Sequence, residues 1–155
     1  MHVDESGVQA SICREYARAP RGEKARGEKQ GNRKGRINLI GAEHQGGIIA
    51  PARFEGSCNA DMALKWLSEV LLPLLSPGMW LIMDNASFHK PRRIRDLIES
   101  RGCRVAFLPA YSPDLNPIEG HWSGVKARIR SCRHRFERLV DAVDCALQPT
   151  VLTSA

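Results

Sequence analysis

Three carboxylates lie where the sequence predicts that structural elements begin or end. Asp84 directly follows the apolar run 80–83, as in a buried strand that delivers a side chain to the edge of a sheet. Asp4 follows a first strand fragment, and Glu119 falls in the first turn of a predicted helix. Converging carboxylates bind hard cations such as Mg²⁺, which take oxygen ligands and act together with substrate phosphates. Two such ions, roughly 3.5 to 4 Å apart, support phosphoryl transfer, and this is the chemistry we expect if these side chains meet.

Each carboxylate also has a plainer interpretation. Glu119 could serve only in a helix capping box, and Asp84 only as a turn former with Asn85. Asp4 could be a surface residue near the terminus. His89 could contact DNA or a metal-bound water, or it could be structural. The residues alone leave these alternatives open.

A basic segment accounts for the whole net positive charge of the chain. The formal net charge is +6, from 23 basic and 17 acidic residues. Residues 14–36 hold nine basic and three acidic side chains, so the other positions hold 14 of each. Because the segment is rich in glycine and poor in apolar residues, it is predicted to be a mobile loop or ribbon. It suits a DNA phosphate backbone, although a merely solvated loop explains the composition equally well. The candidate DNA-binding residues are Arg14, Arg18, Arg21, Lys24, Arg26, Lys29, Arg33, Lys34, Arg36, His89 and Lys90.

The composition predicts one soluble domain. The chain has 155 residues, of which 43% are hydrophobic and 26% charged. The sequence has neither a basic and apolar leader nor an unbroken apolar span, so we expect a cytoplasmic, nucleoid-associated protein without a membrane segment. Its five cysteines are far apart and include no Cys-x-x-Cys pair, which argues against a zinc or redox centre. No P-loop or serine hydrolase motif supports another enzyme class.

Hydrophobic periodicity predicts the elements that must position the carboxylates. Residues 1–4 are predicted to end a strand, and residues 10–14 could pair with them beyond a turn at Ser6 and Gly7. Residues 36–42 and 47–54 form a predicted hairpin. The elements predicted next are helix 60–75 with Ser57 or Asn59 as its cap, strand 79–83, a helix from Pro91 to a stop at Gly102, and strand 103–108.

The last third of the chain is predicted to be helical. Asn116 is the predicted N-cap of the first helix, with Pro117 at its first position and Glu119 three residues after the cap. A second amphipathic helix is predicted over residues 135–147. Three strands, a helix, a strand, a helix, a strand and then helices indicate an α/β fold, a mixed sheet with helices on its faces.

Two segments carry a resemblance to a known family. Residues 81–90 (LIMDNASFHK) and 108–119 (LPAYSPDLNPIE), with Trp122, closely resemble the DDE endonuclease domain of mariner-superfamily bacterial insertion-sequence transposases. The resemblance extends to residues 3–7 and 19–22, so it covers roughly residues 2 to 130. The 34 residues between Asp84 and Glu119 also resemble the family's spacing.

The resemblance implies a ribonuclease-H-like fold, a five-stranded mixed sheet flanked by helices. It implies that Asp4, Asp84 and Glu119 form a catalytic triad that binds two Mg²⁺ ions, with Mn²⁺ as a substitute. In this arrangement Asp4 bridges both ions, while Asp84 and Glu119 each hold one. Water first attacks the transposon-end phosphodiester, and the freed 3′ hydroxyl then attacks target DNA. The alternative is a catalytically inactive, basic DNA-binding remnant of the same fold.

The resemblance also implies partners and a domain organisation. Residues 1–132 correspond to the catalytic domain, and residues 133–155 to a C-terminal helix and tail. The partners are the inverted repeats of the transposon, target DNA and a second copy of the chain. Family members carry an upstream helix-turn-helix module, which is absent from this chain and could be a separate polypeptide. Only three residues precede Asp4, so the first strand is expected to be truncated.

Overall fold

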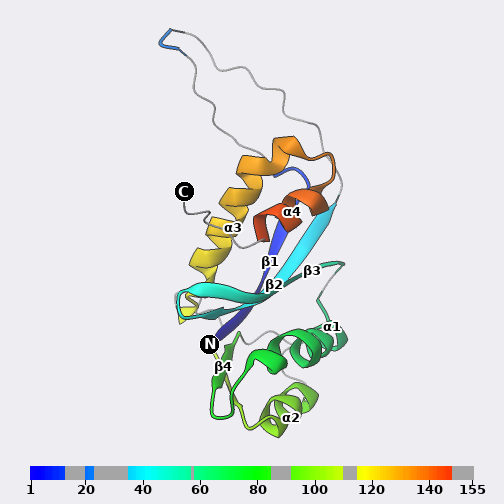
Figure 1. The fold of residues 1–155 in the computed structure, drawn as a ribbon, viewed down its shortest axis with the longest axis vertical. Helices are drawn as coiled ribbons and strands as arrows, with labels where there is room; N and C mark the ends of the chain where they lie inside the picture. The colour runs from blue at the N-terminus through cyan, green and yellow to red at the C-terminus, as the bar shows by residue number, and fades with distance from the viewer. Residues whose placement is uncertain (13–19, 23–34, 57, 85–91, 110–114, 148–155) are drawn as a thin grey trace, which may run out of the picture.

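One five-stranded mixed sheet organises the chain. The computed structural model describes residues 1–12, 20–22, 35–56, 58–84, 92–109 and 115–147. The strand order is β3-β2-β1-β4-β5, as Figure 1 shows for β1 to β4. The first three strands pair antiparallel, and β4 and β5 continue the sheet in parallel from β1. The predicted mixed sheet is therefore confirmed. The strands are β1 (His2–Gln9), β2 (Arg36–His44), β3 (Gly47–Glu55), β4 (Trp80–Met83) and β5 (Arg104–Phe107).

The first strand differs from the prediction. A turn was expected at Ser6 and Gly7, but β1 runs through both residues and pairs with β2 along its whole length. Gly7 lies under the guanidinium group of Arg36, where a Cβ would collide with it. Long-range pairing therefore overrides the local turn signal, and the chain turns only after Gln9. β1 has eight residues, from His2 to Gln9, and is therefore longer than a typical strand.

Helices cover both faces of the sheet. Figure 1 shows α1 and α2 together beside β4, and α3 and α4 together over β1 to β3. Helix α1 continues through a π-helical turn and a 3₁₀ turn, so the helical segment ends at Leu74, close to the predicted end. Pro73 lies in the 3₁₀ turn and cannot donate the next helical hydrogen bond. The helices are α1 (Ala60–Trp66), α2 (Arg92–Ser100), α3 (Ile118–Cys132) and α4 (Leu139–Leu147).

Two helix ends follow the predicted chemistry. Asn59 caps α1, because its side-chain oxygen accepts a hydrogen bond from the Met62 N–H at 2.9 Å. Gly102, with a φ of 71°, ends α2 and donates its N–H to the Glu99 carbonyl at 2.9 Å. The predicted Pro91 start of α2 and the alternative cap Ser57 lie outside the described residues.

The cap on α1 provides a test of this local structure. We expect Asn59→Ala to lower the free energy of unfolding by about 1 kcal/mol, since the Met62 N–H then loses its partner. Asn59→Ser is the matched control, because serine can still accept the bond and should retain most of the stability. Urea denaturation of the three proteins measures the difference. Equal stability of the alanine and serine variants would contradict the assigned cap.

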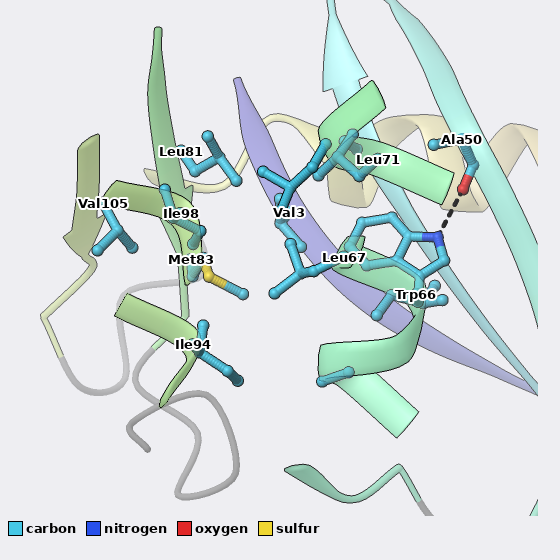
Figure 2. Close-up of a cluster of buried hydrophobic side chains, with 14 of the residues drawn as sticks. Val3, Ala50, Trp66, Leu67, Leu71, Leu81, Met83, Ile94, Ile98 and Val105 are labelled. Carbon is cyan, nitrogen blue, oxygen red and sulfur yellow. Dashed lines mark hydrogen bonds between the residues drawn. The ribbon is translucent and has the colours of Figure 1, made fainter. Parts of the chain in front are cut away.

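The α1 and α2 face of the sheet packs as one apolar core. Val3, Leu81, Met83 and Val105 point into it from the central and edge strands, as Figure 2 shows. They meet side chains from the helices, including Trp66, whose Nε1–H donates to the Ala50 carbonyl at 2.9 Å (Figure 2). This core involves all five strands.

The α3 and α4 face packs differently. Its buried cluster combines Val8 of β1 with Ile37 and Leu39 of β2, and the apolar stripe of α3 covers them. The members of that stripe are Ile118, Trp122, Val125 and Ile129. Neither β4 nor β5 contributes a described side chain to this cluster. On this face α3 and α4 therefore cover β1, β2 and β3, and their cluster does not extend over β4 and β5.

The final helix begins later than predicted. Residues 133–135 form a 3₁₀ turn, and α4 starts at Leu139 instead of residue 135. The buried Arg133 side chain donates to the carbonyls of Phe136 and Glu137, which fixes a break between α3 and α4. An ion pair between Arg53 and Asp144 then ties β3 to α4. No helix among the described residues is long and apolar enough to cross a membrane.

Candidate active site

The register between β1 and β4 brings two of the predicted carboxylates together. Val3 pairs with Met83 in the parallel ladder, and the next residues along the two strands are Asp4 and Asp84. Neighbouring strands lie about 4.8 Å apart. Val3 and Met83 point into the α1 and α2 core (Figure 2), so alternation directs Asp4 and Asp84 toward the opposite face. These two side chains therefore lie side by side on the α3 face of the sheet.

Glu119 reaches the same face from the first turn of α3. Ile118 and Trp122 anchor this turn in the core, whereas Glu119 is exposed. A pocket of about 400 Å³ lies between the helix and β1, and both Asp4 and Glu119 line it. Asp84 directly follows β4, beside Asp4. The structure thus gathers the three predicted carboxylates around one region of the sheet.

The predicted cap of α3 is wrong. Pro117, with helical φ and ψ of −63° and −20°, is the N-cap, and no side chain caps the helix. Asn116 contributes its backbone carbonyl, which accepts from the Glu119 N–H at 3.2 Å, while its side chain is buried. The helical conformation of Pro117 moves the cap one residue along the chain. Glu119 is then only the second residue of the helix, so the capping-box interpretation of this carboxylate fails.

The electrostatic environment of Asp4 connects the three carboxylates. Burial raises the pKa of Asp4 to about 6, partly opposed by a hydrogen bond from the Glu5 backbone. The negative charges of Asp84, Glu119 and Glu5 also contribute to this raised pKa of about 6. An ionised Asp4 is therefore destabilised by low solvation and by neighbouring charge of the same sign. A bound cation would relieve both effects.

The donor set suits a metal that is completed by its substrate. In the part of the chain that the structure describes, no group of three or more His, Cys, Asp or Glu side chains is placed to hold one ion. Mg²⁺ does not require such a cage, because it commonly binds one or two carboxylates together with waters and substrate phosphates. The adjacent oxygen donors of Asp4 and Asp84, with the elevated pKa of Asp4, fit that mode of binding.

The predicted DNA-binding residues are only partly described. Arg36 begins β2, is exposed, and lines the pocket that contains Asp4 and Glu119. Arg21 is exposed in a turn. The others lie outside the described residues: Arg14, Arg18, Lys24, Arg26, Lys29, Arg33, Lys34, His89 and Lys90.

Two polar residues that line the pocket from α3 escaped the prediction. Ser123 and Lys126 line the pocket from α3, four and seven residues after Glu119. This is the spacing of side chains that share one helix face, so the helical periodicity could have identified them. Lys126 is the second cation of the pocket, after Arg36. The two cations line the same pocket as the carboxylates of Asp4 and Glu119.

The topology and the position of the carboxylates define a ribonuclease-H-like fold, as the sequence predicted. The Mos1 strand transfer complex contains a chain with a TM-score of 0.68 and 24% identity, covering 94% of this chain and 45% of that chain. The catalytic core domain of BIV integrase matches with a TM-score of 0.53 and 18% identity, covering 74% and 73% respectively. Mos1 mariner paired-end complexes with Mn and with Mg match with TM-scores of 0.63 and 0.61.

The family follows from the sequence match. Residues 1–141 match the family described as DDE superfamily endonuclease, and the chain belongs to that family. The transposable element Tcb2 transposase of Caenorhabditis briggsae is 32% identical over 79 residues, which are 46% of this chain and 29% of that protein. The chain thus spans less than half the length of both the Tcb2 and the Mos1 proteins. The resemblance to the DDE endonuclease domain of transposases is confirmed, whereas a bacterial insertion-sequence origin is not shown.

Proposed function

We propose that this chain is the catalytic domain of a DNA transposase, which cleaves transposon ends and joins them to target DNA with divalent metal ions. The register that sets Asp4 beside Asp84, on the face reached by Glu119, is the observation that carries the proposal. Membership of the DDE endonuclease family and the structural likeness to Mos1 support it.

The three carboxylates are the proposed metal ligands. Asp4, which the β1–β4 pairing places beside Asp84 and which lines one pocket with Glu119, would contact both ions, while Asp84 and Glu119 would each hold one. Bound Mg²⁺ or Mn²⁺ supplies activation of the attacking oxygen and stabilisation of the leaving oxygen. Mos1 complexes with both metals support this assignment. Because no side chain must form a covalent bond to DNA, positioning and charge are the contributions of this chain.

The remaining pocket residues orient the DNA. Arg36 and Lys126 attract the phosphate backbone toward the carboxylates. The Ser123 hydroxyl donates to the Glu119 carbonyl at 3.1 Å and so supports the first turn of α3. Water attacks the phosphodiester in the first step, and the freed 3′ hydroxyl attacks target DNA in the second. The basic residues in the segment 14–36 extend the DNA-binding surface.

The proposed assembly contains more than this chain. Paired-end complexes of Mos1 support a dimer that holds two transposon ends. Recognition of the inverted repeats is assigned to a helix-turn-helix polypeptide that acts with residues 1–132, the catalytic domain. Residues 133–155 follow the catalytic domain and contain α4, which packs on α3.

Metal-dependent nicking of DNA tests the proposed function. We expect the purified chain to nick supercoiled DNA in Mg²⁺ or Mn²⁺, and chelation of the metal to stop the reaction. Asp84→Ala should remove the activity. The matched control is Asp96→Ala, which deletes an exposed carboxylate of α2 that pairs with Arg92 at the surface. Nicking that survives Asp84→Ala would reject the proposal, and salt-sensitive DNA binding without any nicking would favour the inactive alternative.

A further inference from the structure

Among the described residues, α3 and α4 leave a strip of the sheet beside the carboxylates uncovered. Leu81, Met83 and Val105 point into the α1 and α2 core, so the alternate residues of β4 and β5 face the other way. These residues are Trp80, Ile82, Arg104 and Ala106, and we call them the β4–β5 strip. None of them belongs to the cluster beneath α3 and α4. The strip ends at Asp84, two residues beyond Ile82 on the same face.

The strip carries an exposed aromatic ring paired with a cation. Trp80 is 49% exposed, whereas the other two tryptophans, Trp66 and Trp122, are each 3% exposed. The guanidinium carbon of Arg104 lies 5.4 Å from the centre of the Trp80 ring, and the two residues are partners in the parallel ladder. Aromatic rings and guanidinium groups are the side-chain groups on which nucleic acid bases stack.

The composition and the size of the strip indicate the kind of ligand. Up to Asp84 its described side chains are apolar or cationic, which suits an anionic strand with flat bases. From the strand spacing, its two cross-strand pairs cover on the order of 100 to 200 Å². A stable protein interface buries about 800 Å² on each partner, so the strip is too small to hold a second protein by itself. One or two bases match its dimensions.

We propose that the Trp80–Arg104 pair binds an unpaired base of the DNA strand that enters the carboxylate site. This inference rests on the proposed function only in taking DNA as the ligand. Trp80 precedes Asp84 by four residues, which corresponds to about 13 Å along an extended strand. That length equals about four steps of 3.4 Å along one DNA strand. The strip therefore holds a base a few nucleotides from the scissile phosphate.

Tryptophan fluorescence tests the contact directly, because Trp80 is the exposed tryptophan. Acrylamide quenching is measured in EDTA, so that no cleavage occurs, with a single-stranded oligonucleotide or a hairpin-capped duplex of the same sequence. We expect the single strand to protect Trp80, and the capped duplex, whose bases are stacked and paired, to protect it much less. Equal protection by both DNAs would overturn base stacking. Protection that grows with protein concentration alone would assign the strip to a second copy and would also overturn the proposal.

Variants of the strip provide the energetic test. Trp80→Ala should raise the Kd for the single strand by roughly 5- to 150-fold, the range for loss of one stacked base. Trp80→Phe should retain most of the affinity, because it keeps an aromatic face. Leu74→Ala is the matched control, since Leu74 is 59% exposed and lies in the helical segment after α1. Unchanged affinity of Trp80→Ala, or an equal loss in Leu74→Ala, would reject the proposal.

The outcome is separable from that of the proposed function. A chain that nicks DNA while Trp80 stays accessible refutes the strip and leaves the catalytic assignment intact. A chain in which single-stranded DNA protects Trp80 but no metal supports nicking refutes the catalytic assignment and leaves the strip intact.

Discussion

Replacing Asp4 with asparagine will abolish metal-dependent DNA cleavage and, in the metal-free protein, raise the free energy of unfolding at neutral pH. Cleavage should fall by roughly a thousandfold, because bound metal contributes several kcal/mol to stabilisation of the transition state. Stability should rise because burial and the charges of Asp84 and Glu119 oppose ionisation of Asp4. The substitution thus separates the demands of catalysis from those of folding.

The pH dependence of this stability has a definite sign. The pKa of Asp4 is raised from 3.8 to about 6 on folding, so the folded state binds a proton more tightly than the unfolded state. Below pH 3.8 Asp4 is protonated in both states and does not lower the free energy of unfolding. As the pH rises from 3.8 through 6 the ionised side chain destabilises the fold, and above pH 6 the full cost remains. For this partly exposed group the cost is on the order of 2 kcal/mol.

Urea denaturation in EDTA at pH 4 and pH 7.5 measures the effect. We expect Asp4→Asn to match the original protein at pH 4 and to exceed it at pH 7.5. Added Mg²⁺ should raise the Tm of the original protein more than that of the variant. Asp61→Asn is the control, because Asp61 is an exposed carboxylate on α1 that pairs with Arg93 at the surface. A variant that is less stable than the original protein at pH 7.5 would contradict the assigned environment of Asp4.

The sequence predicted elements best where local pattern and tertiary packing agree. The apolar run 80–83 is a strand, and Gly102 ends its helix, because each needs little more than its own neighbours. Ser6 and Gly7 have the composition of a turn, yet pairing with β2 and the Arg36 side chain above Gly7 make them part of β1. Asn116 has the composition of a cap, yet its side chain is buried and Pro117 takes that position. Local propensity failed where distant partners decide the conformation.

The residues of the candidate site also differ in whether the local sequence or only the tertiary structure identifies them. Asp84 and Glu119 could be selected because an apolar strand and a helix start mark their positions. Their proximity to Asp4 required the β1–β4 register, which the chain does not display locally. Lys126 required the helix periodicity together with the pocket, and Trp80 required knowledge of which strands α3 and α4 leave uncovered. The carboxylates were thus predictable as candidates, whereas the surface that would guide DNA to them was not.

The second large effect is expected at Trp122, which sets the distance between α3 and the sheet. Its ring lies against Gly41, where a Cβ would approach the Trp122 Cη2 atom to 3.1 Å. Gly41 is the partner of Asp4 in the antiparallel ladder. Trp122 therefore connects the helix that carries Glu119 to the strands that carry Asp4. Trp122→Ala should lower the free energy of unfolding by about 3 to 5 kcal/mol, as large-to-small changes of buried aromatic residues do.

Phenylalanine substitutions at two tryptophans distinguish packing from hydrogen bonding. Trp66 and Trp122 are equally buried, on opposite faces of the sheet. Trp66 donates its Nε1–H to the Ala50 carbonyl, whereas the buried Nε1–H of Trp122 has no hydrogen-bond partner among the described residues. Trp66→Phe should therefore cost about 1 to 2 kcal/mol more than Trp122→Phe, because it also removes a buried hydrogen bond. Urea denaturation of the two variants under identical conditions measures the difference.

Cleavage should respond in the opposite order. Trp122→Phe keeps an aromatic ring in the core but removes the part of the indole that touches Gly41, so α3 can shift toward the sheet and move Glu119 relative to Asp4. Small misplacements of catalytic groups cost about a hundredfold in rate. We therefore expect Trp122→Phe to lose more cleavage activity than Trp66→Phe despite its higher stability. If activity instead follows stability in both variants, then Trp122 supports the fold alone, and the position of Glu119 does not depend on its ring.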